Sequence, residues 1–400
     1  MEKLSETFVI CKKVFKYLGF WDDKTNRSYT LYSYAMWFTF IYLFDVFQLM
    51  FFTTVTDMYS ISEGLSIIVC ELVLIQKLMT IKRCIPRIEE LFSILDSVQF
   101  RPKSTDEWKV VESVHNRAMG MSRFLYYCIF TAVLLYVLIP IANHSGELFS
   151  PAWYPWDLTS PIKYYATFIY QAIGIYICAA TVVAYDSFVF GFLLHTHGQI
   201  ERLSIRLEKL GYESLAVDPS VKPDKGMIEI EKYSENLAAR KGSVYYGEVV
   251  RCVLLHKKIL DFVEEVQRIF RSAIFNQFVV SAMVICMSLY QLVTITGNPL
   301  MHVSRMTYTV ALVSELFVYC YAGNEVRHSS KKLSYQAFKS DFLKFDKSTS
   351  VVLQIFMIKS YREIIVQAGN VIPVTLSLET FAAIIRLSYS FLALLQSMQP

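Results

Sequence analysis

The sequence lacks the signatures of common enzymes and of nucleotide-binding or metal-binding sites. It contains no GxGxxG loop, no P-loop, no HExxH helix and no CxxC pair. His195 and His197 are only two positions apart, and side chains at that spacing do not share a helix face. We therefore expect no enzyme, no catalytic residue, no metal site and no cofactor.

Charged residues are scarce in this chain of 400 residues. They make up 18% of it, whereas 54% of the residues are hydrophobic. A soluble protein carries about 25% charged residues. The mean hydropathy is positive, at +0.37. The composition indicates an integral membrane protein in contact with lipid, and it gives no reason to expect nucleic-acid binding.

Seven apolar runs are each long enough to cross a bilayer as a helix, which takes about 20 residues. Their limits are 34–56, 61–81, 123–143, 164–194, 272–296, 303–324 and 374–395. The predicted fold class is an all-α membrane protein with seven transmembrane helices.

Lysine and arginine lie almost entirely on one side of these runs. Of the 39 basic residues, 34 precede the first run or follow the second, fourth or sixth. Basic residues stay in the cytoplasm, so the N-terminus is predicted to be cytoplasmic and the C-terminus extracellular. This is the reverse of the orientation of G-protein-coupled receptors, whose acidic-Arg-Tyr triplet is also missing after the third run.

The outer loops predicted in this way are short, apart from 143–163, and contain no cysteine, so we expect no disulfide. Asn143-His144-Ser145 matches the glycosylation acceptor pattern on this side, which makes Asn143 a candidate for modification. Residues 1–33 lack the apolar core of a signal peptide. We expect the first membrane helix to act as its own anchor.

The predicted organisation follows from these limits. It comprises a cytoplasmic N-terminal segment (1–33), transmembrane helices one to four (34–194), a cytoplasmic helical extension and loop (195–271), transmembrane helices five and six (272–324), a cytoplasmic helical anchor segment (325–373), and helix seven with a short extracellular tail (374–400). Helical register continues to a break at Gly211 and resumes from Val249 to Phe270. The resumed helix either docks under the membrane or projects inward and packs subunits together.

Six charged residues lie well inside the predicted spans, where a charge at the bilayer centre costs about 2.5 to 3.5 kcal/mol. Each is either functional or paired within the bundle. We expect Lys77 and Asp186 to pair within the bundle or to snorkel near the inner face, and we expect Arg386 to have an acidic or carbonyl partner such as Glu71 or Glu315. The sixth residue is Asp45.

Aromatic residues make up 15% of the chain, and several tyrosines recur in the outer halves of helices two to six. A cavity lined by them suits a small, mostly apolar molecule with one hydrogen-bonding group. The predicted ligand-binding residues are Ile67, Tyr136, Tyr170, Ile173, Gly174, Tyr176, Tyr290, Tyr308 and Thr309.

Six short motifs follow one another in the last part of the chain. They are Leu316–Glu325, Ala337–Phe342, Lys359–Arg362, Ala368–Gly369, Ser377–Phe381 and Ser388–Ser390. In this order and spacing they resemble the insect odorant receptors, specifically their odorant-tuning subunits. The length near 400 and the inside N-terminus extend the resemblance over the whole chain.

The resemblance implies a ligand-gated, non-selective cation channel in the plasma membrane of olfactory sensory neurons. Such a receptor binds a small volatile molecule, and it forms a heterotetramer with the odorant co-receptor. The seventh element would be split into a cytoplasmic helix over 350–365, which joins the subunits, and a pore-lining helix that begins near Pro373. Counted from Tyr389, the gate falls at Leu392 and Gln396.

Besides a secondary transporter, which needs broken helices or inverted repeats that the sequence does not show, two alternatives stay open. One is a taste (gustatory) receptor channel of the same superfamily, which ends in Thr-Tyr, five apolar residues and Gln-Phe. Here Ser388-Tyr389 is followed by six residues before Gln396-Ser397. The other is a seven-helix receptor that signals through cytoplasmic proteins, which requires the opposite orientation.

Overall fold

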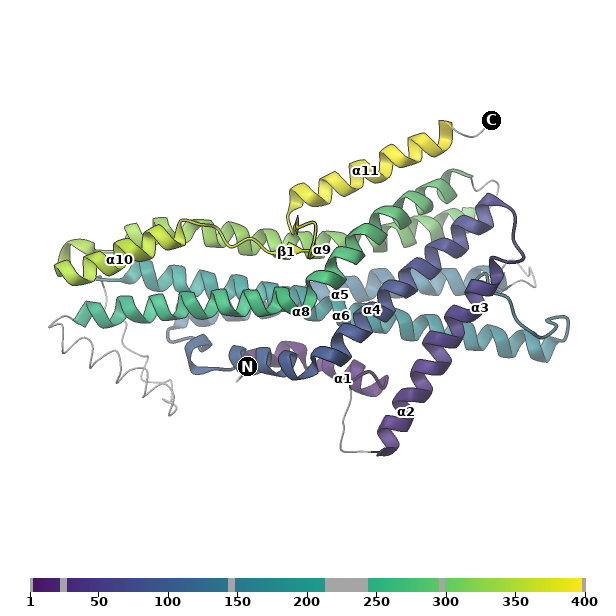
Figure 1. Cartoon of the computed structure of the whole chain (residues 1–400), viewed down its shortest axis with the longest axis horizontal. Coiled ribbons are helices and arrows are strands. Elements are labelled where there is room, and N and C mark those ends of the chain that lie inside the picture. Colours follow the sequence, from purple (N-terminus) through teal and green to yellow (C-terminus); the bar gives the residue numbers. More distant parts are fainter. Residues whose placement is uncertain (1–2, 22–26, 143–147, 213–243, 295–298, 398–400) are drawn as a thin grey trace.

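The computed structural model describes residues 3–21, 27–142, 148–212, 244–294 and 299–397. It shows an elongated bundle of helices, and the longest run along much of its length (Figure 1). These are α4 (Met58–Leu95), α5 (Thr105–Ala142), α6 (Pro161–Lys209), α8 (Val244–Thr294) and α9 (Pro299–Phe338). Helix α6 contacts the other four, which makes it the centre of the bundle.

The central position of α6 follows from its sequence. From Val183 to Leu194 every side chain is buried, on all faces of the helix. A helix that is apolar all round belongs inside a bundle, because no face of it gains from contact with water. Near its end, Gly211 has a φ of +85°, and this left-handed residue stops the helical register as predicted.

The first predicted span consists of three helical pieces that follow one another directly. They are α2 (Arg27–Trp37), the π-helical turn η2 (Phe38–Tyr42) and α3 (Leu43–Phe51). Before them, η1 (Leu4–Phe8) and α1 (Val9–Tyr17) pack against α6. There the ring of Phe8 stacks on Phe192, with centroids 4.5 Å apart.

The seventh element is split, as the family resemblance implies. A short turn η4 (Phe342–Lys344) leads into α10 (Lys347–Ser360), and then a two-stranded antiparallel hairpin pairs β1 (Gln367–Ala368) with β2 (Val374–Thr375). Helix α11 (Leu378–Ser397) follows and contacts α8 and α9.

The predicted limits of this split element were partly wrong. The cytoplasmic helix ends at Ser360 instead of position 365, and Pro373 lies in the hairpin directly before β2 instead of in the first turn of α11. Ser377 begins α11, because its hydroxyl accepts a hydrogen bond from the backbone N–H of Thr380 at 3.1 Å. A serine N-cap satisfies a donor that a proline at this point leaves unpaired.

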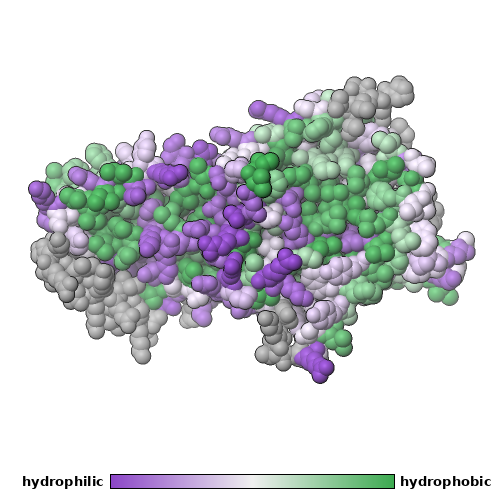
Figure 2. Space-filling model, in the orientation of Figure 1, coloured by the Kyte–Doolittle hydropathy of each residue, from purple (hydrophilic) through white to green (hydrophobic). Residues whose placement is uncertain are grey.

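Five helical stretches among the described residues are long and apolar enough to cross a membrane. They are Arg27–Phe51, Met58–Leu95, Thr105–Ala142, Pro161–Lys209 and Tyr245–Thr294. Helices α9 and α11 are not among them, so the count of seven spans stays a prediction. In Figure 2 the hydrophobic surface covers most of the right half of the molecule, where α3, α4 and α11 lie. Large apolar side chains exposed in this way are expected against lipid.

All five long helices continue well beyond the predicted spans. Helix α8 runs without a break through both Val249–Phe270 and the fifth predicted span. Residues 249–270 therefore form no separate helix, and their role in packing subunits together stays a prediction. The start of α8, the end of α9 and the whole of α10 gather at one end of the bundle, and the end of α11 points to the other (Figure 1).

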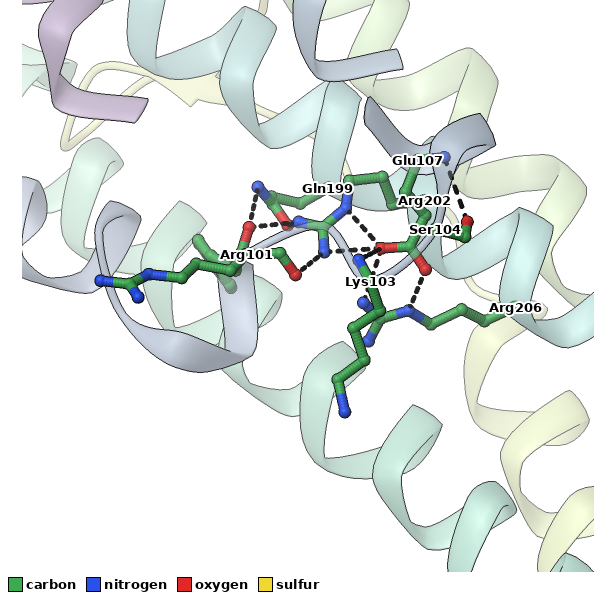
Figure 3. A network of polar contacts seen from close by, with 8 residues as sticks. Arg101, Lys103, Ser104, Glu107, Gln199, Arg202 and Arg206 are labelled. Atoms are coloured by element: carbon green, nitrogen blue, oxygen red, sulfur yellow. Dashed lines mark hydrogen bonds and ion pairs between the residues drawn. The ribbon is translucent and has the colours of Figure 1, made fainter. Parts of the chain in front are cut away.

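A buried ion cluster ties the start of α5 to the end of α6 (Figure 3). The Glu107 carboxylate accepts hydrogen bonds from Arg206 at 2.7 Å and from Arg202 at 2.9 Å. Arg202 also donates to the backbone carbonyl groups of Phe100, in η3 (Val98–Phe100), and of Arg101. Burial by itself raises the pKa of Glu107, but the hydrogen bonds and charges of the two arginines outweigh burial and lower the pKa to about 2.

Candidate functional site

A cavity of about 170 Å³ lies within the bundle, between α4, α5, α6 and α9. Its walls are predominantly apolar. A dry protein cavity of about 150 Å³ is enough to bind benzene. The cavity therefore has room for a small organic molecule.

Each helix contributes residues at helical spacing to the cavity wall. Helix α4 contributes Ser66, Ile67, Cys70, Glu71 and Leu74; α5 contributes Ile129, Ala132, Val133 and Tyr136; α6 contributes Ile175, Cys178, Ala179 and Val182; α9 contributes Ser304, Arg305, Tyr308, Ala311, Leu312 and Glu315. Steps of three and four residues place side chains on one face of a helix. Four such faces enclose the cavity.

An ion pair forms one end of the cavity. Arg305 of α9 contacts the carboxylate of Glu63, which lies on α4 one turn before Ser66. The Arg305 guanidinium also lies over the ring of Tyr136, 5.6 Å from its centroid, and the Tyr136 hydroxyl donates to Glu63 at 3.3 Å. These contacts link α4, α5 and α9 at that end.

A second ion cluster lies at the opposite end of the cavity. Lys77 of α4 donates to Asp186 at 2.8 Å and to Glu315 at 2.9 Å, and its side chain is 1% exposed. Asp186 also accepts a hydrogen bond from the Tyr319 hydroxyl at 2.5 Å. Lys77 and Asp186 therefore pair within the bundle, which is one of the two outcomes expected for them, and Glu315 completes the cluster. Three helices are thereby held together beneath the cavity.

A third polar group lies on the wall between these two clusters. Glu71 is 9% exposed and lines the cavity, and one of its oxygens, Oε1, accepts a hydrogen bond from Gln48 of α3 at 3.2 Å. Its second oxygen, Oε2, is buried, and Glu71 is hydrogen-bonded to the neighbouring buried carboxyl group of Asp45.

The structure brings three of the nine predicted ligand-binding residues to the cavity, namely Ile67, Tyr136 and Tyr308. The other six lie outside its lining. Tyr170 donates to the backbone carbonyl of Thr39, and Gly174 faces the ring of Phe44. Ile173 and Tyr176 line a shallow groove on the outside of α6, and Thr309 donates to the backbone carbonyl of Arg305. Tyr290 is half-buried on α8, which contributes no residue to the cavity wall. Which of the nine touch a ligand stays a prediction.

Sequence reasoning missed most of the wall because it followed the tyrosines. Glu71 and Glu315 were recognised as ionisable residues in the spans, but they were not connected to the ligand site. Stepping along the helix from Ile67 by three and four residues reaches Cys70, Glu71 and Leu74, all of which line the cavity. The same steps from Tyr308 reach Leu312 and Glu315.

The predictions for the gate, the glycosylation site and Arg386 have different outcomes. Leu392 is 8% exposed and packs on the side of α11 that faces the bundle, which does not favour a position in a pore. The side chain of Gln396 and all of Asn143 lie outside the described residues. Arg386 is exposed on α11, and no acidic or carbonyl partner is found for it in the described part of the chain. Its expected pairing with Glu71 or Glu315 was wrong, because Gln48 and Lys77 bind those carboxylates.

Comparison with known proteins gives consistent matches over nearly the whole chain. The sequence matches the family profile described as 7tm Odorant receptor over residues 57–389. It is 33% identical to Odorant receptor Or1 of Anopheles gambiae over 393 residues, which covers 96% of this chain and 93% of that relative. It is 25% identical to Odorant receptor 2a of Drosophila melanogaster, over 93% of this chain and 91% of that one.

The fold is similar to solved structures as well. The insect olfactory receptor OR5 from Machilis hrabei, in complex with eugenol, matches with a TM-score of 0.82 over 99% of both chains, at 14% identity. A second structure of OR5 matches with a TM-score of 0.80 over 98% of this chain and 97% of that one. At this identity the similarity establishes the fold.

Proposed function

Because the chain belongs to the 7tm Odorant receptor family, we propose that it is the odorant-binding subunit of a ligand-gated, non-selective cation channel. The observation that carries this proposal is the apolar cavity between α4, α5, α6 and α9. A small volatile molecule binds there mainly by burial of its apolar surface. The related structure of OR5 was solved with eugenol, a molecule of suitable size.

The packing of α9 supports a route from ligand to pore. Helix α9 forms one wall of the cavity and, further along, contacts α11, where the rings of Phe317 and Phe381 meet edge to face at 5.6 Å. The backbone also approaches closely at Gly323, where an added Cβ atom meets Leu376 at 2.3 Å. A displacement of α9 by the ligand is therefore passed to α11, whose outer end moves away from the pore axis.

The available binding energy limits how far the channel opens. A ligand of about ten heavy atoms binds with roughly 5 to 8 kcal/mol. Shifting a gate from 1% to 99% open takes about 5.5 kcal/mol of differential affinity, which is most of that amount. We therefore expect partial opening, or a closed state that is only slightly favoured, and sensitivity in the micromolar range.

Exposed apolar faces support assembly with an odorant co-receptor in a heterotetramer. Val351, Ile355 and Ile358 recur along one face of α10 and are 46%, 54% and 74% exposed. Apolar residues at this spacing, far from the lipid-facing surface, are expected to be covered by another subunit. Helix α11 likewise exposes Arg386, Tyr389 and Ser390, which fits a face directed towards a shared aqueous axis.

The chain is a multi-pass membrane protein, and we place it in the plasma membrane of olfactory sensory neurons with its N-terminus in the cytosol. The distribution of lysine and arginine supports this orientation. Membership of the odorant receptor family removes the support for a taste receptor and for a seven-helix receptor coupled to cytoplasmic proteins.

The deciding experiment records current from cells that express the chain with and without an odorant co-receptor, across a panel of volatile molecules. We expect inward cation current that depends on dose, on the volatile molecule and on the co-receptor. The co-receptor expressed alone is the control. A membrane that carries no added current with any volatile, although both subunits reach the surface, contradicts the proposal.

A further inference from the structure

Arg386 is a charged residue in the middle of the last helix. It lies eight residues after the first residue of α11 and eleven before the last one. At a rise of about 1.5 Å per residue, it is therefore about 12 Å and about 16 Å from the two ends of the helix. Its side chain is exposed, and the described residues supply no acidic or carbonyl partner for it. An arginine reaches the membrane boundary only from near a helix end, so Arg386 needs another environment for its charge.

The two faces of α11 differ in their chemistry. The face that packs on the bundle carries the apolar side chains of Ile384, Ile385 and Leu392. On the same face, the Ser388 hydroxyl donates to the backbone carbonyl of Ala282 in α8 at 3.1 Å. The opposite face is exposed, and at steps of three and four residues it carries Glu379, Ala383, Arg386, Ser390 and Ala393. No large apolar side chain belongs to this set, although a surface in contact with lipid is rich in such side chains.

The position of Arg386 indicates what this face of α11 meets in the assembled channel. Charged residues within membrane spans face a protein partner or a water-filled cavity, because lipid offers no group that solvates them. The other helices of this chain lie on the opposite side of α11, where α8 and α9 contact it. The environment that accommodates Arg386 is therefore water enclosed together with other subunits.

We propose that Arg386 lines the pore and is a selectivity-determining residue that lowers the permeability of divalent cations, such as calcium, relative to sodium and potassium. This rests on the proposed function, because it requires that α11 borders the pore of a cation channel. A fixed positive charge repels a divalent cation twice as strongly as a monovalent one. Because other subunits share the pore, Arg386 grades cations by their charge instead of forming the complete basic ring that is typical of anion pores.

The test measures the reversal potential of odorant-evoked current in cells that express the chain with the co-receptor, with sodium and then calcium as the main external cation. At about 7 Å in water, the repulsion by one arginine amounts to about one RT for a monovalent cation and about two RT for a divalent one. Arg386→Gln should therefore raise the ratio of calcium to sodium permeability about two- to threefold. The larger effect is expected at low ionic strength, where screening is weaker.

Three further variants separate the charge of Arg386 from its size and position. Arg386→Lys keeps the charge and should keep the permeability ratio of the unaltered receptor. Arg386→Glu reverses the charge and should raise the ratio further than Arg386→Gln does. Lys163→Gln is the matched control, because it removes a positive charge at an exposed position on α6 and should leave the ratio unchanged.

The possible results distinguish this inference from the proposed function. An unchanged ratio in Arg386→Gln, with odorant-evoked current of normal size, overturns the role of Arg386 and leaves the channel proposal intact. Absence of current with every volatile in the unaltered receptor, although both subunits reach the surface, overturns the proposed function and this inference with it.

A second position keeps the inference testable if Arg386→Gln fails to reach the surface or to carry current. Ser390→Glu lies one turn further along the same exposed face and brings a negative charge to it. This variant should raise the ratio of calcium to sodium permeability, in the same direction as loss of the arginine. A ratio that stays at the value of the unaltered receptor shows that this face does not border the pore and overturns the inference.

Discussion

Substitution of Tyr136 and Tyr308, the two tyrosines that line the cavity, tests whether they contact the ligand or only pack the helices. Tyr308→Ala and Tyr136→Ala each remove a ring from the wall, so we expect them to change the order in which odorants activate the receptor without abolishing current. Tyr176→Ala is the matched control, because Tyr176 lies on the outside of α6. Dose–response curves for a common panel measure the effect. An unchanged order in both cavity variants argues that odorants bind elsewhere.

Lys77 illustrates how a single buried cation holds several helices. Replacing it with methionine leaves Asp186 and Glu315 without their cation, and losing one partner of a buried pair costs about 3 to 5 kcal/mol. We expect Lys77→Met to lower the temperature of unfolding and the amount of receptor at the surface. Lys163→Met, at an exposed position on α6, should leave both unchanged. Thermal denaturation in detergent and surface labelling measure the two quantities.

The lowered pKa of Glu107 predicts that the stability of the protein depends on pH. Its pKa in the folded protein is about 2, below the ordinary value of 4.5, so its contribution to stability is fully present above pH 4.5 and is lost as the pH falls towards 2. The shift corresponds to roughly 3 kcal/mol. Glu107→Gln should lower the unfolding temperature at pH 6, and its difference from the unaltered protein should shrink below pH 4. A difference that stays constant over this range contradicts the pairing of Glu107 with the two arginines.

At the scale of elements, the approach of α9 to the hairpin before α11 depends on Gly323. A methyl group there meets the Cβ atom of Leu376 at 2.3 Å and its carbonyl oxygen at 2.6 Å, so one of the two segments must shift. Forcing extra volume into packed contacts costs about 1 to 3 kcal/mol. We expect Gly323→Ala to reduce odorant-evoked current per receptor at the surface.

Gly120→Ala on α5 is the matched control for this substitution. No atom lies within 4 Å of the added methyl group, and alanine favours a helix over glycine by about 1 kcal/mol. This variant should keep full current and unfold at an equal or higher temperature. Equal loss of current in the two variants shows that the contact between α9 and the hairpin does not transmit the ligand signal.

At the scale of the whole molecule, the sidedness of the bundle is open to a direct test. Helix α10, the end of α9 and the start of α8, which belong to segments predicted to be cytoplasmic, gather at one end (Figure 1). An epitope tag at residue 1 should be inaccessible to antibody on intact cells and accessible after permeabilisation, and a tag after residue 400 should be accessible on both. The opposite pattern overturns the assigned orientation and the channel assembly built on it.

The sequence was sufficient wherever a property depends on nearby residues. Hydrophobic runs located the membrane helices to within a few residues on at least one side, Gly211 marked the end of α6, and the ordered motifs after Leu316 identified the family. The predicted start of the last helix, at Pro373, was wrong. This proline lies in a hairpin, and Ser377 caps the helix four residues later. Local sequence patterns do not show at which of two possible starts the first backbone N–H groups of a helix find a hydrogen-bond acceptor.

The tertiary structure decided what depends on helices far apart in the chain. It placed Tyr136 and Tyr308 on the cavity wall and Tyr170 and Tyr290 outside it. It also paired Glu315 with Lys77 instead of with Arg386. A tyrosine on a membrane helix faces a cavity, a neighbouring helix or lipid according to the rotation of that helix in the bundle. That rotation is fixed by the packing of every helix against the others, so no single segment of the sequence contains it.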